Sequence, residues 1–319
     1  AWTAAPAALE AAGIDRRALG KFREIRPSLD LTAEMARLDK LGISILTWND
    51  DEYPGPLKEL RKLDQAPPVL YLRGTLFERD DLAVAIVGTR NASAYGRQVA
   101  HQLAGELAAN GLTIVSGLAH GIDTQAHRAA LETGGRTIAV LPCGLDTIYP
   151  AENRHLVADI LRSGLILSPF PLKTAPIGRF FPYRNSVISG LSLGVIVIEA
   201  AEKSGSTLTA GIAMEQGREV FAVPGNITAK GSSGTNSLIR DGAHPVLSAQ
   251  DVLDVLDIQR VSHYKQARTE LPPVSGPEQA LLDALGTEPV HIDELARQLD
   301  MPVSQMSGTL TLLQLTRLV

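Results

Sequence analysis

The chain has 319 residues, of which 45% are hydrophobic and 20% are charged, and its formal net charge is −5. This length allows two or three globular domains, and the mild negative charge argues against a protein that coats nucleic acid by bulk electrostatics. No apolar run approaches the ~20 residues of a membrane span and the N-terminus shows no export signal, so we expect a cytoplasmic protein without a membrane partner. The single Cys143 excludes an internal disulfide framework and a cysteine-based zinc site.

Short helices are predicted at the start of the chain. The stretches AALEAAG and DLTAEMARLDKLG have helical spacing, and each ends at a glycine. The stretches DEYPGPLKEL and QAPPVLYLRG follow as a Pro-rich connection. We therefore expect a small helical domain, together with its connection, over residues 1–74.

From about residue 82, short apolar runs alternate with stretches of helix length. The runs are AVAIVG (83–88), LTIVSG (112–117), RTIAVLP (136–142), GLILSPF (164–170), GVIVIEA (194–200) and REVFAVPG (218–225). Strands that are buried on both faces and alternate with helices predict an α/β domain with a parallel, doubly wound sheet over residues 75–257. In such a sheet, ligands bind beyond the carboxyl ends of the strands.

The C-terminal part is predicted to be a linker (258–275) followed by a helical domain (276–319). The stretches PEQALLDALG, HIDELARQLD and VSQMSGTLTLLQL predict three helices in a helix-turn-helix arrangement, and we expect the β-hairpin wing to be absent from the chain. Residues 265–319 carry four basic and seven acidic side chains, and the would-be recognition helix 303–315 has no Lys or Arg. A helix in the major groove needs such cations, so we favour a protein-contact or structural role over direct DNA reading.

Glycine, hydroxyl and basic residues follow the predicted strands. The first strand leads into Gly88, Thr89 and Arg90, and the second ends at Ser116 and Gly117. Two later loops add Lys203, Gly205, Ser206 and Lys230. Such residues at helix N-termini expose N–H groups at a positive dipole end, which suits phosphate. We predict an anion-binding surface at this edge, with ordinary turn chemistry as the alternative.

The standard nucleotide-binding motifs do not match. The first turn reads VGTRNAS instead of G-x-G-x-x-G, and the second strand ends in Ser116 instead of an acidic residue, so NAD is not expected. AKGSSGT lacks the G-K-[ST] of a P-loop. The loop from Pro224 is similar to the P-G-G-x-G-T-x-x-E motif of lonely-guy nucleotide hydrolases, but GTNSLI has no glutamate at the catalytic position. We expect no cofactor, and a nucleotide-binding hydrolase that uses the same pocket stays the alternative.

The stretch RFFPYRNS (179–186) interleaves Arg179 and Arg184 with three aromatic side chains, in a chain that is only 4% aromatic. Aromatic platforms beside guanidinium groups are typical of surfaces that bind single-stranded nucleic acid. Arg184 is therefore a candidate phosphate contact. For the aromatic side chains, a packed connection or a dimer contact is the alternative to base stacking.

The stretch VSGLAHGIDTQAH (115–127) contains Ser116, His120, Asp123 and His127, which could form a catalytic or metal-binding set. A helix that starts at Gly121 leaves His120 in the loop and places Asp123 four residues before His127, where a local hydrogen bond is expected. Ser116 is not in a G-x-S-x-G elbow. We therefore predict structural roles for these side chains, and a filler role for Cys143.

The motifs VGTRNASAYG, VSGLAHGIDTQAHRAAL, LPCGLDTIYPAEN, FPYRNSVISGLS, EAAEKSGSTLTA and VPGNITAKGSSGTNSLIRDGA together resemble the DNA-processing protein A (DprA, or Smf) family. The similarity runs from about Tyr53 to Ala243. It implies a Rossmann-like sheet flanked by an N-terminal helical, SAM-like domain and a C-terminal winged-helix-like domain. It also implies a dimeric, non-enzymatic protein that binds and protects incoming single-stranded DNA and promotes RecA recombinase loading in natural transformation and recombination.

Carried over by motif, Arg90, Lys203 and Arg184 are implied to be the basic residues that contact DNA. The resemblance implies that the loops at Ser116-Gly117, Gly205-Ser206 and Gly225-Asn226 line the same pocket. Gly88, Thr89 and Asn185 are further candidate contacts to DNA phosphates. The family often shows an arginine where this chain has Ser186. A transcription-type adaptor that acts through the C-terminal helices is a third hypothesis.

Overall fold

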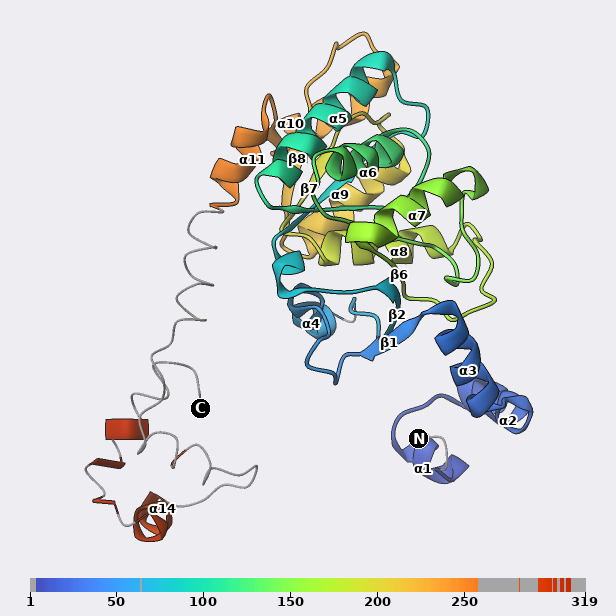
Figure 1. Cartoon of the computed structure of the whole chain (residues 1–319), viewed down its shortest axis with the longest axis vertical. Coiled ribbons are helices and arrows are strands. Elements are labelled where there is room, and N and C mark those ends of the chain that lie inside the picture. The colour runs from blue at the N-terminus through green and yellow to red at the C-terminus, as the bar shows by residue number, and fades with distance from the viewer. Residues whose placement is uncertain are drawn as a thin grey trace. The chain divides into compact units, whose positions relative to one another are not determined.

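The chain divides into two compact units, Ala1–Leu256 and Asp257–Val319 (Figure 1). The computed structural model describes residues 4–63, 65–257, 281, 292–299, 301–302, 305–306 and 308–310. The predicted linker 258–275 lies outside the described residues. The domain boundaries expected from the sequence stay predictions.

A nine-stranded sheet forms the centre of the first unit, with the strand order β1-β2-β6-β5-β4-β3-β7-β8-β9. Strands β3 to β9 pair in parallel, β2 pairs antiparallel with β6, and β1 pairs antiparallel with β2. The predicted doubly wound α/β fold is thereby confirmed. The strands are β1 (Ser44–Thr47), β2 (Val69–Gly74), β3 (Ala83–Val87), β4 (Thr113–Ser116), β5 (Thr137–Val140), β6 (Leu165–Ser168), β7 (Gly194–Val197), β8 (Glu219–Ala222) and β9 (His244–Pro245).

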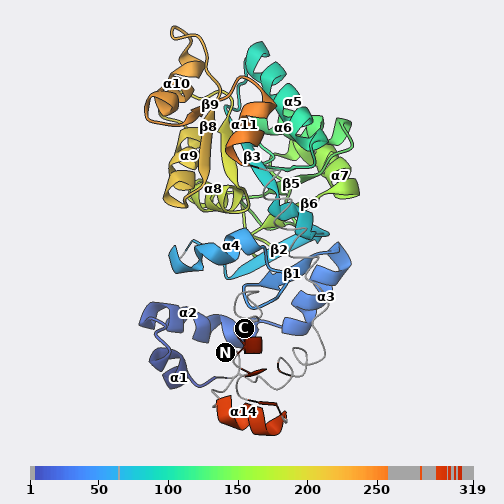
Figure 2. The same cartoon turned by 90° about the vertical axis from the view of Figure 1, so that its left-hand side faces the viewer.

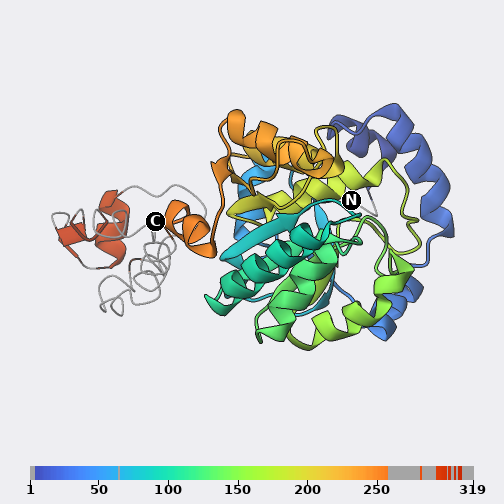
Figure 3. The same ribbon diagram turned by 90° about the horizontal axis from the view of Figure 1, so that it is seen from above.

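Helices cover both faces of this sheet. Seen from above, α5, α6 and α7 lie on one face, and α8, α9 and α10 lie on the other (Figure 3). Strands β3 to β7 are completely buried because both faces are covered. The helices are α5 (Ala94–Ala109), α6 (Ile122–Glu132), α7 (Arg154–Ser163), α8 (Phe180–Gly190), α9 (Gly205–Glu215), α10 (Ser233–Arg240) and α11 (Ala249–Val255), with the short 3-10 turns η4 (Ala151–Asn153) and η5 (Lys230–Ser232).

The N-terminal part forms the predicted helices and then departs from the prediction. It contains α1 (Pro6–Ala11), α2 (Arg16–Ile25), η1 (Arg26–Ser28), α3 (Leu31–Leu41), α4 (Gly55–Glu59), η2 (Leu60–Leu63) and, after β2, η3 (Glu78–Asp81). Asp30 caps α3 by accepting a hydrogen bond from the Ala33 N–H, and Gly42 ends this helix in the left-handed region.

The expectation of only helices and a Pro-rich connection up to residue 74 is wrong for two segments. β1 and β2 form an antiparallel pair that extends the large sheet (Figure 2). The physical reason is the two-residue alternation in β2, which places Leu70 and Leu72 in the core while Val69 and Tyr71 stay half-buried.

The second unit has a small core of its own. Leu281, Leu295, Ala296 and Met306 are buried together, and α14 (Ile292–Gln298) supplies two of them. The described residues of the predicted recognition helix are 305–306 and 308–310, and all five are helical. Across the described parts of both units, every helix is too short or too polar to cross a bilayer.

A buried ion pair between Arg136 and Asp80 stabilises the edge of the sheet where the parallel strands begin. The Nε and Nη2 atoms of Arg136 lie 2.5 Å and 2.7 Å from the two carboxylate oxygens of Asp80, and both side chains are almost fully buried. Arg136 also donates to the Ser163 carbonyl, and Asp80 accepts from the Thr113 hydroxyl. The pair therefore ties η3 to β4, β5 and α7.

We predict that Asp80→Ala lowers the free energy of unfolding by about 3–5 kcal/mol, because it leaves the Arg136 charge buried without a counter-charge. Urea denaturation measures this change. Glu10→Ala is the control, since it breaks the exposed Arg16–Glu10 pair and should cost no more than about 1 kcal/mol. Equal losses in the two variants would contradict the prediction.

Candidate functional site

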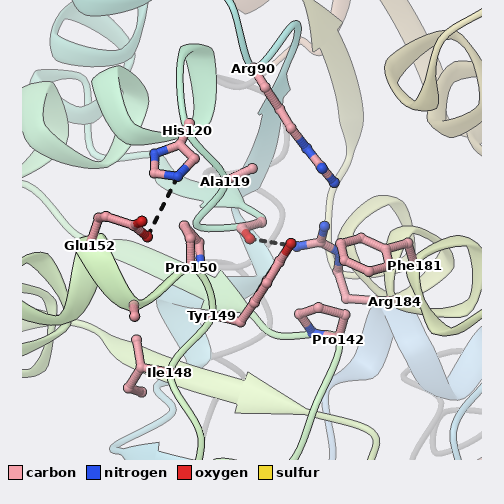
Figure 4. Close-up of a pocket in the computed structure, with 12 residues that line it drawn as sticks. Arg90, Ala119, His120, Pro142, Ile148, Tyr149, Pro150, Glu152, Phe181 and Arg184 are labelled. Carbon is pink, nitrogen blue, oxygen red and sulfur yellow. Dashed lines mark hydrogen bonds and ion pairs between the residues drawn. The ribbon is translucent and has the colours of Figure 1, made fainter. Parts of the chain in front are cut away.

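A cavity of about 360 Å³ opens at the carboxyl ends of β3, β4 and β5 (Figure 4). Arg90, Gly117 and Pro142 each follow one of these strands, and residues 148–152 form another wall. Phe181 and Arg184 enter from α8. The cavity therefore lies at the strand edge where ligands bind in doubly wound sheets.

Arg184 is a buried cation at this cavity, with only 4% of its surface exposed. Its Nη1 donates to the carbonyls of Gly117 and Val140 at 2.5 Å and 2.8 Å, and its Nε donates to Asn185 Oδ1 at 3.1 Å. Its Nη2 keeps contact with solvent and has no acceptor among the described residues. The guanidinium is thus held by three hydrogen bonds while one nitrogen stays free to bind a ligand.

The Asp123 carboxylate provides the counter-charge for the buried Arg184 guanidinium. Burial lowers the pKa of Arg184 to about 10, the Asp123 carboxylate acts in the opposite direction, and neighbouring Arg90 lowers it further. Burial also raises the pKa of Asp123, against the effect of Arg184 and of the N–H groups of Ala119 and Gly117. With its pKa near 10, the guanidinium keeps its positive charge at neutral pH.

Arg90 adds a second, exposed guanidinium. Its centre lies 5.3 Å from the centroid of the Phe181 ring, and that of Arg184 lies 5.6 Å from the same centroid. Figure 4 shows the two guanidinium groups approaching each other beside this ring. Arg90 donates no hydrogen bond to any described residue, and the Thr89 N–H holds its loop by donating to the Glu199 carbonyl at 2.8 Å. Two cations with free donors therefore converge on one cavity.

Gly117 is required by this arrangement, whereas Ser116 lies away from the cavity. A Cβ on Gly117 would lie 2.1 Å from Arg184 Nη1 and 2.9 Å from Asp123 Oδ2. The Gly117 N–H donates to Asp123, and the Ser116 hydroxyl, which is fully buried, donates to the Ile86 carbonyl at 2.6 Å. The donors that the sequence suggested for a ligand are therefore already bonded within the protein.

The expected hydrogen bond between Asp123 and His127 is absent from the described residues, although both side chains are buried. The first turn of α6 directs Asp123 to the N–H groups of Gly117 and Ala119, at 3.1 Å and 3.3 Å. His127 Nδ1 lies 2.6 Å from Thr137 Oγ1. Since the Thr137 hydroxyl donates to a main-chain carbonyl, Nδ1 carries the proton and donates to it.

His120 lies in a loop and Cys143 fills an apolar core, as the sequence predicted. His120 lies in the loop before α6, with its Nε2 3.7 Å from Glu152 Oε2 at the cavity. Cys143 is packed in an apolar core cluster, and burial raises the pKa of its thiol to about 11. No group of three or more His, Cys, Asp and Glu side chains within the described residues could hold a metal ion.

The remaining predicted residues lie on the same strand edge but outside the cavity walls. Lys203 follows β7 and Lys230 follows β8, and both are exposed without an ion pair to any described residue. Asn185 connects α8 to the first of these loops by donating to the Gly205 carbonyl at 3.5 Å. The structure therefore places Arg90 and Arg184 together and distributes Lys203, Gly205, Ser206, Gly225, Asn226 and Lys230 over neighbouring loops.

The aromatic side chains of residues 179–186 are used partly for packing. The ring centroid of Phe180 lies 4.5 Å from that of Phe170, and the ring centroid of Phe181 lies 5.9 Å from that of Tyr149. Tyr183 also contacts Phe170 but is 37% exposed. The packed connection considered from the sequence is therefore present for Phe180.

Two functional features were missed by the sequence reasoning. Residues 148–152 wall the cavity, although nothing in the motif LPCGLDTIYPAEN predicts a ligand-binding role for them. Glu199 is the last residue but one of the apolar run 194–200, and its carboxylate accepts a hydrogen bond from the Ser93 N–H at 2.9 Å. An acidic residue at the end of an apolar strand pattern, two residues after β7, was the available signal for the second feature.

Comparisons with known proteins agree with this architecture. The family model described as DNA recombination-mediator protein A matches residues 44–257, and the DprA winged helix domain matches residues 265–319. The chain is 36% identical to Protein Smf of Escherichia coli (strain K12) over 316 residues, which cover 96% of this chain and 83% of the relative.

Two solved structures are also similar. DNA processing protein A from Streptococcus pneumoniae has a TM-score of 0.68 at 41% identity, covering 77% of this chain and 84% of that one. DNA processing protein A from Helicobacter pylori has a TM-score of 0.60 at 35% identity, covering 68% of this chain and 96% of that one. The Helicobacter pylori structure is described as revealing a unique single-stranded DNA binding mode.

We predict that His127 makes the fold sensitive to acid. Burial lowers the pKa of His127 to about 3 from its usual value of 6.5, so between these values the unfolded chain binds a proton that the native state does not. Stability attributable to this residue falls as the pH falls through that window, by up to about 1.4 kcal/mol per pH unit.

Urea denaturation at pH 6.5 and pH 4.5 tests this. Wild type should lose about 2 kcal/mol more stability than His127→Asn over this interval, because the neutral amide replaces the Nδ1 donor without titrating. Parallel stability curves for the two proteins would show that His127 does not carry the effect.

Proposed function

The chain belongs to the DNA recombination-mediator protein A (DprA/Smf) family, and on that premise we propose that it binds single-stranded DNA along the carboxyl edge of its parallel strands. The observation that carries the proposal is the pair of guanidinium groups at the cavity. Arg184 is held rigidly with one terminal nitrogen free, and Arg90 is exposed with no acceptor among the described residues. Both are suited to bind DNA phosphates.

Lys203 and Lys230 extend the cationic surface beyond the cavity, on the loops after β7 and β8. We propose that they hold further phosphates of the same strand, with the Gly205 and Ser206 N–H groups at the start of α9 as additional donors. Asn185, Gly225 and Asn226 shape these loops; the Asn236 side chain, for example, bonds both main-chain polar groups of Gly225.

We propose a stacking role for the exposed face of Tyr183, while Phe181 serves mainly to orient the two guanidinium groups. Stacking on an aromatic face tolerates every base, which suits binding without sequence preference. The binding mode described for the Helicobacter pylori relative supports single-stranded DNA as the ligand of this chain.

The wider role that we propose follows the family. The protein acts in the cytoplasm as a dimer formed through the Rossmann-like domain, protects incoming single-stranded DNA and promotes loading of the RecA recombinase in natural transformation and recombination. We propose that it does so without catalysis. The buried Asp123 and His127 support this, because each is already engaged by groups of the protein itself.

We predict that Arg90→Ala weakens binding to fluorescent oligo-dT about tenfold or more at low salt, since one charge-assisted contact is lost. The slope of log K against log salt should become shallower by about 0.7, as expected for one phosphate contact with a single strand. Fluorescence anisotropy over a salt series measures both quantities.

Arg162→Ala is the matched control for this measurement. Arg162 lies in the last turn of α7, just before β6 begins, and therefore at the opposite edge of the sheet. The site assignment fails if Arg90→Ala and Arg162→Ala bind oligo-dT with the same affinity and salt slope.

The recombinase role gives a second prediction. Wild-type protein should accelerate RecA filament formation on oligonucleotides covered by a single-strand binding protein, and Arg90→Ala should not. The DNA-dependent ATPase of RecA provides the measurement. Release of free base from nucleoside monophosphates, measured in parallel, would instead favour the nucleotide hydrolase.

A further inference from the structure

Glu199 places a carboxylate at the point where the strand order of the parallel sheet reverses. It follows β7, which pairs with β3, and the chain leaves β3 towards β4 on the other side. In folds of this type the crevice at the reversal is the place where nucleotide phosphates bind. An acidic side chain is the opposite of what a phosphate site requires.

The carboxylate occupies the N-terminus of α5. Glu199 Oε2 accepts a hydrogen bond at 2.9 Å from the N–H of Ser93, the N-cap residue of this 16-residue helix. The N-terminus of such a helix combines unpaired N–H groups with the positive end of its dipole. Glu199 therefore takes the position that a bound phosphate would take.

A slot between two glycines holds this side chain. A Cβ on Gly96, in the first turn of α5, would lie 2.2 Å from Glu199 Oε2. A Cβ on Gly231, in η5, would lie 2.5 Å from Glu199 Oε1. Side chains at either position would displace the carboxylate, so two separate segments leave room for it.

We propose that Glu199 determines specificity by acting as an internal anion that excludes free nucleotide phosphates from the strand reversal. This rests on the proposed binding of single-stranded DNA. In this proposal the bound DNA runs along both sides of Glu199, with Arg90 and Arg184 on one side and Lys203 and Lys230 on the other. A free nucleotide or pyrophosphate reaches only one flank, whereas a DNA strand reaches both.

The charge and the shape of Glu199 both contribute to the exclusion of free phosphates. A carboxylate 4 Å from a phosphate charge weakens binding about fivefold even at the dielectric constant of water. Its atoms also fill the slot between Gly96 and Gly231. Substitutions that remove the charge alone, or the charge and the volume together, therefore separate the two contributions.

The test is calorimetric titration of the full chain with pyrophosphate, with oligo-dT binding measured in parallel. Glu199→Gln keeps an oxygen that accepts from the Ser93 N–H, so it should retain the fold and bind pyrophosphate about fivefold more tightly than wild type. Glu199→Ala also opens the slot and should bind about tenfold more tightly or better, because the Ser93 N–H at the start of α5 becomes free. Both variants should bind oligo-dT at least as tightly as wild type.

Glu215→Gln is the control, because Glu215 is exposed at the end of α9 that points away from this strand edge. It should leave both ligands unaffected. Unchanged pyrophosphate affinity in Glu199→Gln and Glu199→Ala overturns the proposal, and Glu199→Gln alone decides if Glu199→Ala does not fold. Loss of oligo-dT binding without a gain for pyrophosphate also overturns it, since Glu199 would then only position the Arg90 loop.

The outcome is separable from that of the proposed function. If wild type fails to bind oligo-dT, the proposed function fails, while the pyrophosphate comparison still reports whether Glu199 excludes small phosphates.

Discussion

The buried guanidinium of Arg184 is the constraint on which the candidate site depends. A charge in this position needs acceptors and a counter-charge, because burial without them costs several kcal/mol. The Gly117 and Val140 carbonyls supply the acceptors, and Asp123 supplies the counter-charge. Gly117 must then lack a side chain, since a Cβ would overlap Arg184.

Two internal carboxylates, Asp123 and Glu199, change how this fold can bind an anion. In nucleotide-binding sheets, N–H groups at helix N-termini are the usual phosphate donors. Here Asp123 accepts the Gly117 and Ala119 N–H groups before α6, and Glu199 accepts the Ser93 N–H before α5. With these loop donors engaged internally, the proposed phosphate contacts come mainly from side-chain cations, with the Gly205 and Ser206 N–H groups of α9 in addition. Side chains such as Arg90 lie at the surface, where an extended polymer reaches them more easily than it reaches a crevice.

The sequence predicted β3 to β8 well because each lies in a continuous apolar run between glycine-rich turns, as in residues 83–88 and 194–200. It did not predict β9, whose two residues, His244 and Pro245, form no apolar run. It missed β1 and β2 because both are short, Pro67 and Pro68 directly precede β2, and the pairing of β2 with β6 is a tertiary contact. The motifs identified Arg90 and Arg184, but not that both guanidinium groups flank Phe181. The cavity wall at residues 148–152 was unpredictable for a similar reason, since it exists only once α8 packs beside it.

The net charge of −5 shows why composition is a weak guide to DNA binding. A count of residues gives Arg136 and Arg90 equal weight, yet Arg136 is neutralised by Asp80 at the far edge of the sheet. Arg37 and Arg218 likewise lie beside Asp146 and Glu59. More than half of the net negative charge belongs to residues 265–319, outside the sheet. What attracts a phosphate is the local field of cations without partners, and the strand edge collects these in Arg90, Lys203 and Lys230.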